Sequence, residues 1–204
     1  MARQPNLFLA SSSPRRHELL RALGLEFGLR IGDVDETPLP GESPQDMVLR
    51  LAAAKALSVD AGDDEVVIGA DTAVVIDDAV LGKPKDEEDA ESMLLRLAGR
   101  THSVVTGVAV RGPGGVQTTL SVTQVLFRDI GRDEVRAYWQ SGEPCDKAGA
   151  YAIQGIGGVF VEKIEGSYSG VVGLPIFETV GLLHNAGIDV LPRPPGDDPG
   201  MSPK

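Results

Sequence analysis

The chain has 204 residues, of which 42% are hydrophobic and 24% are charged, and its formal net charge is -11 at neutral pH. These values fit one globular protein with a sizeable core, and they argue against a nucleic-acid-binding surface, because such surfaces neutralise phosphates with Lys and Arg. No apolar run approaches the roughly 20 residues that cross a bilayer. The lone cysteine, Cys145, excludes an internal disulfide, and no signal-peptide pattern is present. We therefore expect a cytoplasmic protein with no nucleic-acid or membrane partner.

The first strand is predicted over residues 7–9, and it leads directly into a helix over residues 14–23 that stops at Gly24. Ser13 suits the N-cap position and Pro14 suits the first helical position. Unpaired N–H groups at a helix N-terminus attract anions, so the hydroxyls and cations beside them form a candidate phosphate site. Its side chains are Ser11, Ser13, Arg15 and Arg16. An ordinary capped helix with two solvated arginines is an equally common explanation of the pattern.

A carboxylate and an ammonium group come next in the chain. Glu36 belongs to an acidic segment that follows an expected strand over residues 27–31, and it is a candidate ligand for a divalent cation. Solvated acidic loops are the commoner case. Lys55 lies on or beside the apolar face of a helix expected over residues 44–59. Most lysines in such places extend from the edge of a core into water.

A buried strand is predicted over residues 66–70, ending at Asp71, and a hairpin is predicted over residues 73–81. Asp71 at a strand end is a candidate catalytic carboxylate. The alternative is a structural aspartate that accepts hydrogen bonds from loop backbone. Lys83 follows within a few residues and supplies a cation.

Long β-rich runs over residues 101–111 and 116–128 predict an antiparallel hairpin. Helices are expected on either side of it, over residues 86–98 and 133–141. His102 begins the first of these strands, and we interpret it as a residue that bonds locally.

Three charged residues precede an expected strand over residues 148–153: Glu143, Asp146 and Lys147. Glu143 or Asp146 is a candidate metal ligand, although three charges within five residues usually mark a solvated loop. The glycine run after this strand does not fit a dinucleotide site, because residues 159–164 predict a strand where a helix is required.

A loop rich in glycine and hydroxyl groups covers residues 166–173 and leads into a helix over residues 176–185. This loop is a second candidate for a phosphate-facing segment. Residues 192–204 are rich in proline and predict a disordered tail without a catalytic part.

The sequence lacks a Walker-type motif, a helical His-Glu-x-x-His motif and a cysteine cluster. What remains is an inventory of carboxylates and cations, which suits hydrolysis of a phosphoanhydride by an oriented water. Asp71 is the candidate base. The candidate phosphate contacts are Arg16, Lys55, Lys83 and Lys147. An all-oxygen metal site predicts Mg²⁺ or Mn²⁺.

Six stretches of the chain, taken in order, resemble the Maf-like nucleotide pyrophosphatases over about residues 6–190. They are residues 9–16, 69–72, 82–84, 101–107, 143–155 and 166–175. The resemblance implies an α/β fold with a mixed elongated sheet, flanking helices and two lobes around a central cleft, similar to Maf and ITPase proteins. It also implies one such domain over residues 1–191, a homodimer, and cleavage of a nucleoside triphosphate to the monophosphate and pyrophosphate.

Three residues match the subgroup of that family that acts on dTTP, UTP and modified uridine triphosphates, namely Arg15, Thr72 and Gln154. The amide of Gln154 offers a donor and an acceptor to the imide edge of a pyrimidine. The resemblance also implies that Lys55 contacts substrate, although Ala54 stands where many relatives carry a glutamate. Housekeeping of non-standard nucleotides is the implied role. The alternative is a nucleotide-binding regulator of cell division and septum formation.

Overall fold

The computed structural model describes residues 6–191, and the predicted tail over residues 192–204 lies outside them. Seven strands form one mixed sheet in the order β2-β1-β3-β5-β6-β7, with β4 paired to β3. The strands are β1 (Asn6–Leu9), β2 (Gly28–Leu29), β3 (Glu65–Ile76), β4 (Ala79–Leu81), β5 (Thr101–Gly112), β6 (Gly115–Phe127) and β7 (Val161–Glu165). Strand β1 runs parallel to β2 and β3, and the other pairs are antiparallel. The predicted mixed α/β fold is confirmed.

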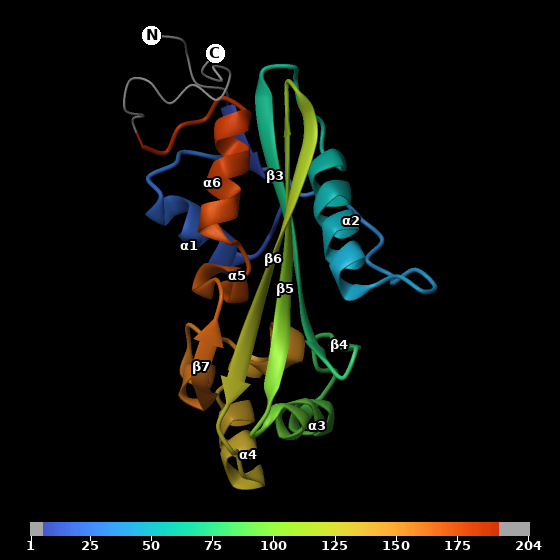
Figure 1. Cartoon of the computed structure of the whole chain (residues 1–204), viewed down its shortest axis with the longest axis vertical. Coiled ribbons are helices and arrows are strands. Elements are labelled where there is room, and N and C mark those ends of the chain that lie inside the picture. Colours follow the sequence, from blue (N-terminus) through green and yellow to red (C-terminus); the bar gives the residue numbers. More distant parts are fainter. Residues whose placement is uncertain (1–5, 192–204) are drawn as a thin grey trace, which may run out of the picture.

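Helices cover both faces of the long strands (Figure 1). The six helices described are α1 (Pro14–Ala22), α2 (Pro44–Leu57), α3 (Glu87–Leu97), α4 (Arg132–Gln140), α5 (Tyr168–Val172) and α6 (Ile176–Asn185). Figure 1 shows α2 on one side of β3, β5 and β6, while α1, α5 and α6 lie on the other and α3 and α4 pack at the far end. In residues 6–191 no helix combines the length and apolar character that a membrane span requires.

The two faces of β3 pack against different helices because successive side chains of a strand alternate. Val66 and Ile68 belong to an apolar cluster that includes residues of α1 and α6, whereas Val67 packs with Ala52 and Ala56 of α2. Separate apolar clusters thus lie on the two faces. A further cluster at the far end joins α3 and α4 to the ends of β3, β5 and β6.

Two glycines allow α2 to approach the sheet closely. A Cβ atom at Gly69 would lie 2.2 Å from the carbonyl oxygen of Ala52, and one at Gly107 would lie 2.4 Å from that of Val48. Any side chain at either position would push the helix away from the strands. The short separation allows a side chain of α2, such as Lys55, to reach the middle of β3.

The long hairpin and most helices agree with the sequence predictions within one or two residues, but β3 differs from its prediction. Strand β3 is continuous from Glu65 to Ile76, since β5 pairs with it from residue 67 to residue 75. Asp71 therefore lies in the middle of a strand, and the expected strand end at that residue is wrong.

Three other expected elements also need correction. Strand β2 covers only Gly28–Leu29 of the five residues expected. The strand expected over residues 148–153 is absent from the described chain: the 3-10 turn η2 (Ala148–Ala150) occupies its first half, with positive φ angles at Gly149 and Ala150 that break an extended run. The loop expected over residues 166–173 contains the short helix α5.

Candidate active site

The main cleft of the described chain lies at a gap along one edge of β3. Strand β1 pairs with β3 only up to Ile68, and β4 begins pairing at Val74, so residues 69–73 carry no neighbouring strand on that edge. A cleft of about 610 Å³ opens there, within the usual size range of ligand pockets. It is bordered by the β1–α1 loop, α2, β4, the segment 146–154 and the end of α5.

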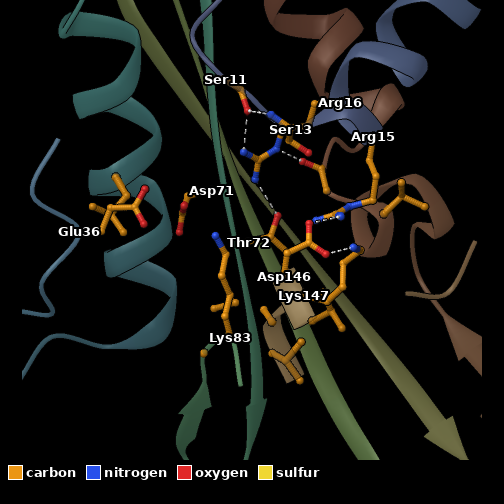
Figure 2. A pocket seen from close by; sticks show the side chains of 18 of the residues that line it. Ser11, Ser13, Arg15, Arg16, Glu36, Asp71, Thr72, Lys83, Asp146 and Lys147 are labelled. Atoms are coloured by element: carbon orange, nitrogen blue, oxygen red, sulfur yellow. Dashed lines mark hydrogen bonds and ion pairs between the residues drawn. The ribbon is translucent and has the colours of Figure 1, made fainter. Parts of the chain in front are cut away.

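Alternation along β3 sends two neighbouring residues to opposite sides of this cleft (Figure 2). Asp71 lies on the side of α2, and Thr72 lies on the side of α1. Both side chains line the same cleft, which opens where β3 has no neighbouring strand. The gap in the strand edge therefore makes both faces of β3 available to one ligand.

Arg16 is held by three separate parts of the chain. Its Nε donates to the carbonyl oxygen of Gly173 at 2.8 Å, its Nη1 to Ser11 Oγ at 3.2 Å and its Nη2 to Thr72 Oγ1 at 3.2 Å. Burial lowers the pKa of the guanidinium and the nearby charge of Asp71 opposes that change, but an arginine stays cationic in proteins. The side chain is thus a fixed positive charge beside the cleft.

On the side of the cleft that faces α2, Lys55 bridges two carboxylates. Its Nζ lies 2.7 Å from Asp71 Oδ1 and 2.6 Å from Glu36 Oε1. The hydrogen bond from Lys55 lowers the pKa of Glu36, against the effect of its partial burial. No described residue donates to the second oxygen of Asp71, and Figure 2 shows the amino end of Lys83 directed toward Asp71.

Arg15 and the segment 146–154 form another wall of the cleft. Arg15 lies 3.8 Å from Asp146, whose side chain is 65% exposed, and Lys147 pairs with the same carboxylate. Burial works to raise the pKa of Asp146, but the hydrogen bond and charge of Lys147 prevail and lower it. Gln154 also lines the cleft and is exposed.

Of the predicted site residues, all but one border this cleft. They are Ser11, Ser13, Arg15, Arg16, Glu36, Lys55, Asp71, Thr72, Lys83, Asp146, Lys147 and Gln154. Ser13 precedes α1 as expected, but its side chain makes no cap hydrogen bond, and its own N–H donates to Ser11 Oγ at 3.2 Å.

Glu143 is the exception among the predicted site residues, because it does not line the cleft. Its carboxylate accepts from Tyr138 Oη at 2.7 Å and from the N–H groups of Ile156 and Gly157 at 2.9 Å each. Burial works to raise the pKa of Glu143, and these hydrogen bonds outweigh it and lower the pKa. The carboxylate thereby links the 3-10 turn η3 (Ile156–Phe160) to α4.

The remaining acidic residues suit a hard cation whose coordination shell also includes substrate phosphates and waters. Within residues 6–191, no group of three or more His, Cys, Asp or Glu side chains is placed to hold a metal ion. Two carboxylates, Glu36 and Asp71, share the ammonium of Lys55. Mg²⁺ is commonly bound by one or two carboxylates together with substrate phosphates and waters, so this donor set fits it.

Sequence reasoning missed two residues that shape the surroundings of Arg16. Gly173 has a φ of 128°, which favours glycine, and presents its carbonyl to Arg16. Thr106 is buried and contacts both Thr72 and the carbonyl of Gly170. The available signal for Thr106 was a hydroxyl within an otherwise apolar strand, where a buried polar group requires a partner.

The sequence profile of the family described as "Maf-like protein" matches residues 6–186. This chain belongs to the Maf-like family. A relative from Hahella chejuensis is 50% identical over 188 residues, covering 90% of this chain and 94% of that protein. Relatives from Vibrio cholerae (52% over 180 residues; 87% and 96% covered) and Anaeromyxobacter dehalogenans (54% over 187 residues; 90% and 95% covered) are equally similar. All three are named dTTP/UTP pyrophosphatase.

Proposed function

We propose that this Maf-like protein hydrolyses dTTP and UTP, together with modified uridine triphosphates, to the nucleoside monophosphate and pyrophosphate. The observation that carries this proposal is the arrangement of three cations around one carboxylate, of which one oxygen accepts no hydrogen bond from the described residues. Arg16, Lys55 and Lys83 border the cleft together with Asp71. The names of relatives about 50% identical over most of the chain support the same activity.

The cations supply the electrostatic part of the reaction. Cleavage between the α and β phosphates increases negative charge on the departing pyrophosphate, and fixed positive groups stabilise that charge without having to reorganise. Arg16 offers a rigid fork to phosphate oxygens, while Lys83 offers a mobile point charge. Lys147 provides a further cation on the opposite wall.

Asp71 supplies the water-activating part. Its Oδ1 is held by Lys55 at 2.7 Å, so the carboxylate has a fixed orientation. Its other oxygen is left to accept a proton from a water that attacks the α phosphate. Thus one oxygen orients the group and the other acts on the water.

We further propose that activity requires Mg²⁺ or Mn²⁺, with Glu36 as the protein ligand and Asp71 beside it. When bound, the ion neutralises phosphate charge and orients the phosphates. Lys55 lies between these two carboxylates and keeps them close together. Asp146 is a weaker candidate ligand, because Arg15 and Lys147 already surround it with positive charge.

Base recognition is assigned to the exposed amide of Gln154 at the edge of the cleft. Its carbonyl and NH₂ groups match the N–H and carbonyl of a uracil or thymine imide edge. Cytosine presents a ring-nitrogen acceptor and an amine donor in place of the imide N–H and carbonyl, and guanine is a larger, bicyclic base, so we expect both to fit the same place less well.

A pyrophosphate-release screen tests the proposal. The protein is incubated with dTTP, UTP, modified uridine triphosphates, CTP and GTP, with Mg²⁺ or Mn²⁺ and after exhaustive chelation. We expect release of pyrophosphate chiefly from dTTP, UTP and the modified uridine triphosphates, and none after chelation. Nucleotide binding without any release would instead support a regulator of cell division, and full activity after chelation would remove the metal requirement.

We also propose a homodimer, as the resemblance to the family implies, and a cytoplasmic location, as the lone cysteine suggests. Light scattering coupled to size-exclusion chromatography measures the assembly directly. The expected mass is twice the 21.5 kDa of one chain.

A further inference from the structure

A chain of polar contacts leads from Arg16 into the interior of the sheet. Arg16 Nη2 lies 3.2 Å from Thr72 Oγ1, which lies 3.0 Å from Thr106 Oγ1. Thr106 Oγ1 in turn lies 2.8 Å from the carbonyl oxygen of Gly170 in α5. Thr106 is only 1% exposed, and it faces Thr72 in the β3–β5 register. These contacts connect α1, β3, β5 and α5 behind the cleft.

The direction of these hydrogen bonds follows from the number of protons. A hydroxyl has one proton to donate, and a carbonyl oxygen can only accept. Thr106 is the donor in both of its contacts, so its one proton is shared between Thr72 Oγ1 and the carbonyl oxygen of Gly170. Thr72 Oγ1 also accepts from Arg16. The hydroxyl oxygen of Thr72 is therefore held from two sides, by Thr106 and by Arg16.

The same count shows what Arg16 can offer. A guanidinium has five N–H donors, and the described protein groups accept one from Nε, one from Nη1 and one from Nη2. One hydrogen remains on each terminal nitrogen. These two donors are available to the oxygens of a phosphate group.

We propose that Thr106 is a positioning residue that acts through Thr72 to aim the two free donors of Arg16 at a phosphate group. Thr72 then holds Arg16 on the phosphate-binding side of the site. The identity of the natural substrate rests on the proposed function. The orientation of Arg16 toward a polyphosphate does not, because it can be tested with an inorganic polyphosphate.

The test measures binding of inorganic tripolyphosphate by isothermal titration calorimetry in the absence of metal. Thr106→Val keeps the shape and removes the donor, and we expect binding about 10-fold weaker than wild type, as for loss of a buried hydrogen-bond partner. Thr106→Ser should restore binding to within about 2-fold, since it restores the donor. The matched control is Thr179→Val: Thr179 is also buried and donates to a carbonyl, that of Pro175 at 2.7 Å, but it does not line the cleft.

A double-mutant cycle separates positioning from general loss of structure. In an Arg16→Lys background the fork is gone, so adding Thr106→Val should weaken tripolyphosphate binding by less than about 2-fold. In the parent background, Thr106→Val should lower kcat/KM by the same factor for dTTP, UTP, CTP and GTP, because a phosphate contact does not distinguish bases.

Four results would overturn the inference: wild-type binding by Thr106→Val, an equal effect of Thr179→Val, an undiminished effect in the Arg16→Lys background, or no tripolyphosphate binding by the wild type. A loss confined to dTTP and UTP would return Thr72 to base selection and would also overturn it. If tripolyphosphate binding behaves as expected while no nucleotide releases pyrophosphate, the proposed function fails and the inference about Thr106 stands.

Discussion

The two walls of the cleft are built differently, although basic and acidic side chains line both. We call the side with Arg16, Lys55 and Asp71 the sheet wall, and the side with Arg15 and the segment 146–154 the opposite wall. On the sheet wall, Arg16 is held by groups from three segments, and Lys55 bridges two carboxylates. On the opposite wall, Asp146 is 65% exposed and is the last residue of a short 3-10 turn, η1 (Glu143–Asp146). Arg15 and Arg16 are adjacent in sequence and reach different walls, because consecutive residues of a helix point about 100° apart.

This difference assigns different tasks to the two walls. Groups held in place by several elements are suited to stabilise charge during a reaction, since they need no rearrangement. Exposed groups on a short turn contribute less to binding energy, because solvent screens them, but they can adapt to the shape of a base. We therefore expect chemistry to depend on the sheet wall and selectivity to depend on the segment 146–154.

The largest expected effect is on the sheet wall, at Asp71. Asp71→Asn keeps the size of the side chain but removes the base, and loss of a general base typically costs on the order of 10² to 10⁴ in rate. We expect kcat for dTTP to fall in this range while the protein still binds nucleotide. The matched control is Asp78→Asn in the exposed β3–β4 turn, which should keep wild-type kcat. Near-normal turnover by Asp71→Asn would make Asp71 structural.

The two neighbouring arginines test the contrast between the walls directly. Arg16→Lys removes the fork and its three fixed contacts, and charged hydrogen bonds are worth about 1.5 to 3 kcal/mol. We expect kcat/KM to fall by about 10- to 150-fold. Arg15→Lys keeps a cation opposite the exposed Asp146, so its effect should stay below about 3-fold. Equal losses in the two variants would abolish the distinction between the walls.

Base choice is the next effect in size, and it is expected on the exposed wall. Gln154→Ala leaves polar groups of the pyrimidine unmatched, at a cost of about 1 to 3 kcal/mol, which is roughly 5- to 150-fold. We expect kcat/KM for dTTP and UTP to fall by that factor and those for CTP and GTP to change much less. Lys83→Ala serves as the comparison, and it should weaken all four triphosphates alike. A uniform loss in Gln154→Ala would show that the amide supports the cleft without reading the base.

The buried histidine of the far cluster gives a prediction about stability. Burial lowers the pKa of His102 to about 4 from an ordinary 6.5, and its Nε2 contacts Tyr151 Oη at 2.9 Å. Between these two pKa values the unfolded chain binds more protons than the folded one, so stability falls as the pH falls. We expect about 2 kcal/mol of the free energy of unfolding to be lost from this group between pH 7 and pH 5.

Urea unfolding at the two pH values measures this loss. His102→Gln does not titrate in this range, so its loss between pH 7 and pH 5 should be smaller than that of the wild type by the same amount. An equal pH dependence in the two proteins would show that His102 is protonated without cost in the folded state.

The smallest expected effect is at Asp146. Because this carboxylate is exposed and flanked by Arg15 and Lys147, Asp146→Asn should change kcat/KM by less than about 3-fold. Titration of Mg²⁺ at fixed dTTP provides the decisive readout. A large rise in the Mg²⁺ concentration needed for half-maximal activity would identify Asp146 as a metal ligand.

Much of the fold follows from local sequence signals. The pairs Ser13-Pro14 and Ser43-Pro44 mark the starts of α1 and α2, and the apolar runs 101–111 and 116–128 predict the β5–β6 hairpin nearly to the residue. These signals act between residues close in the chain, so a single sequence contains them.

The geometry of the site depends on contacts that no local signal encodes. Asp71 and Thr72 both reach the cleft because β1 ends before them and β4 begins after them, and both facts depend on long-range pairing. Glu143 was expected near a metal, but it accepts three hydrogen bonds from Tyr138 and η3. Such partners are known only once the chain has folded.

Product analysis of dTTP hydrolysis by ³¹P nuclear magnetic resonance tests the central claim most directly. The wild-type protein with Mg²⁺ should convert dTTP to thymidine monophosphate and pyrophosphate in equal amounts, and Asp71→Asn should slow both by the same factor. Thymidine diphosphate and inorganic phosphate as the first products would place the cleavage at the γ phosphate and contradict the account.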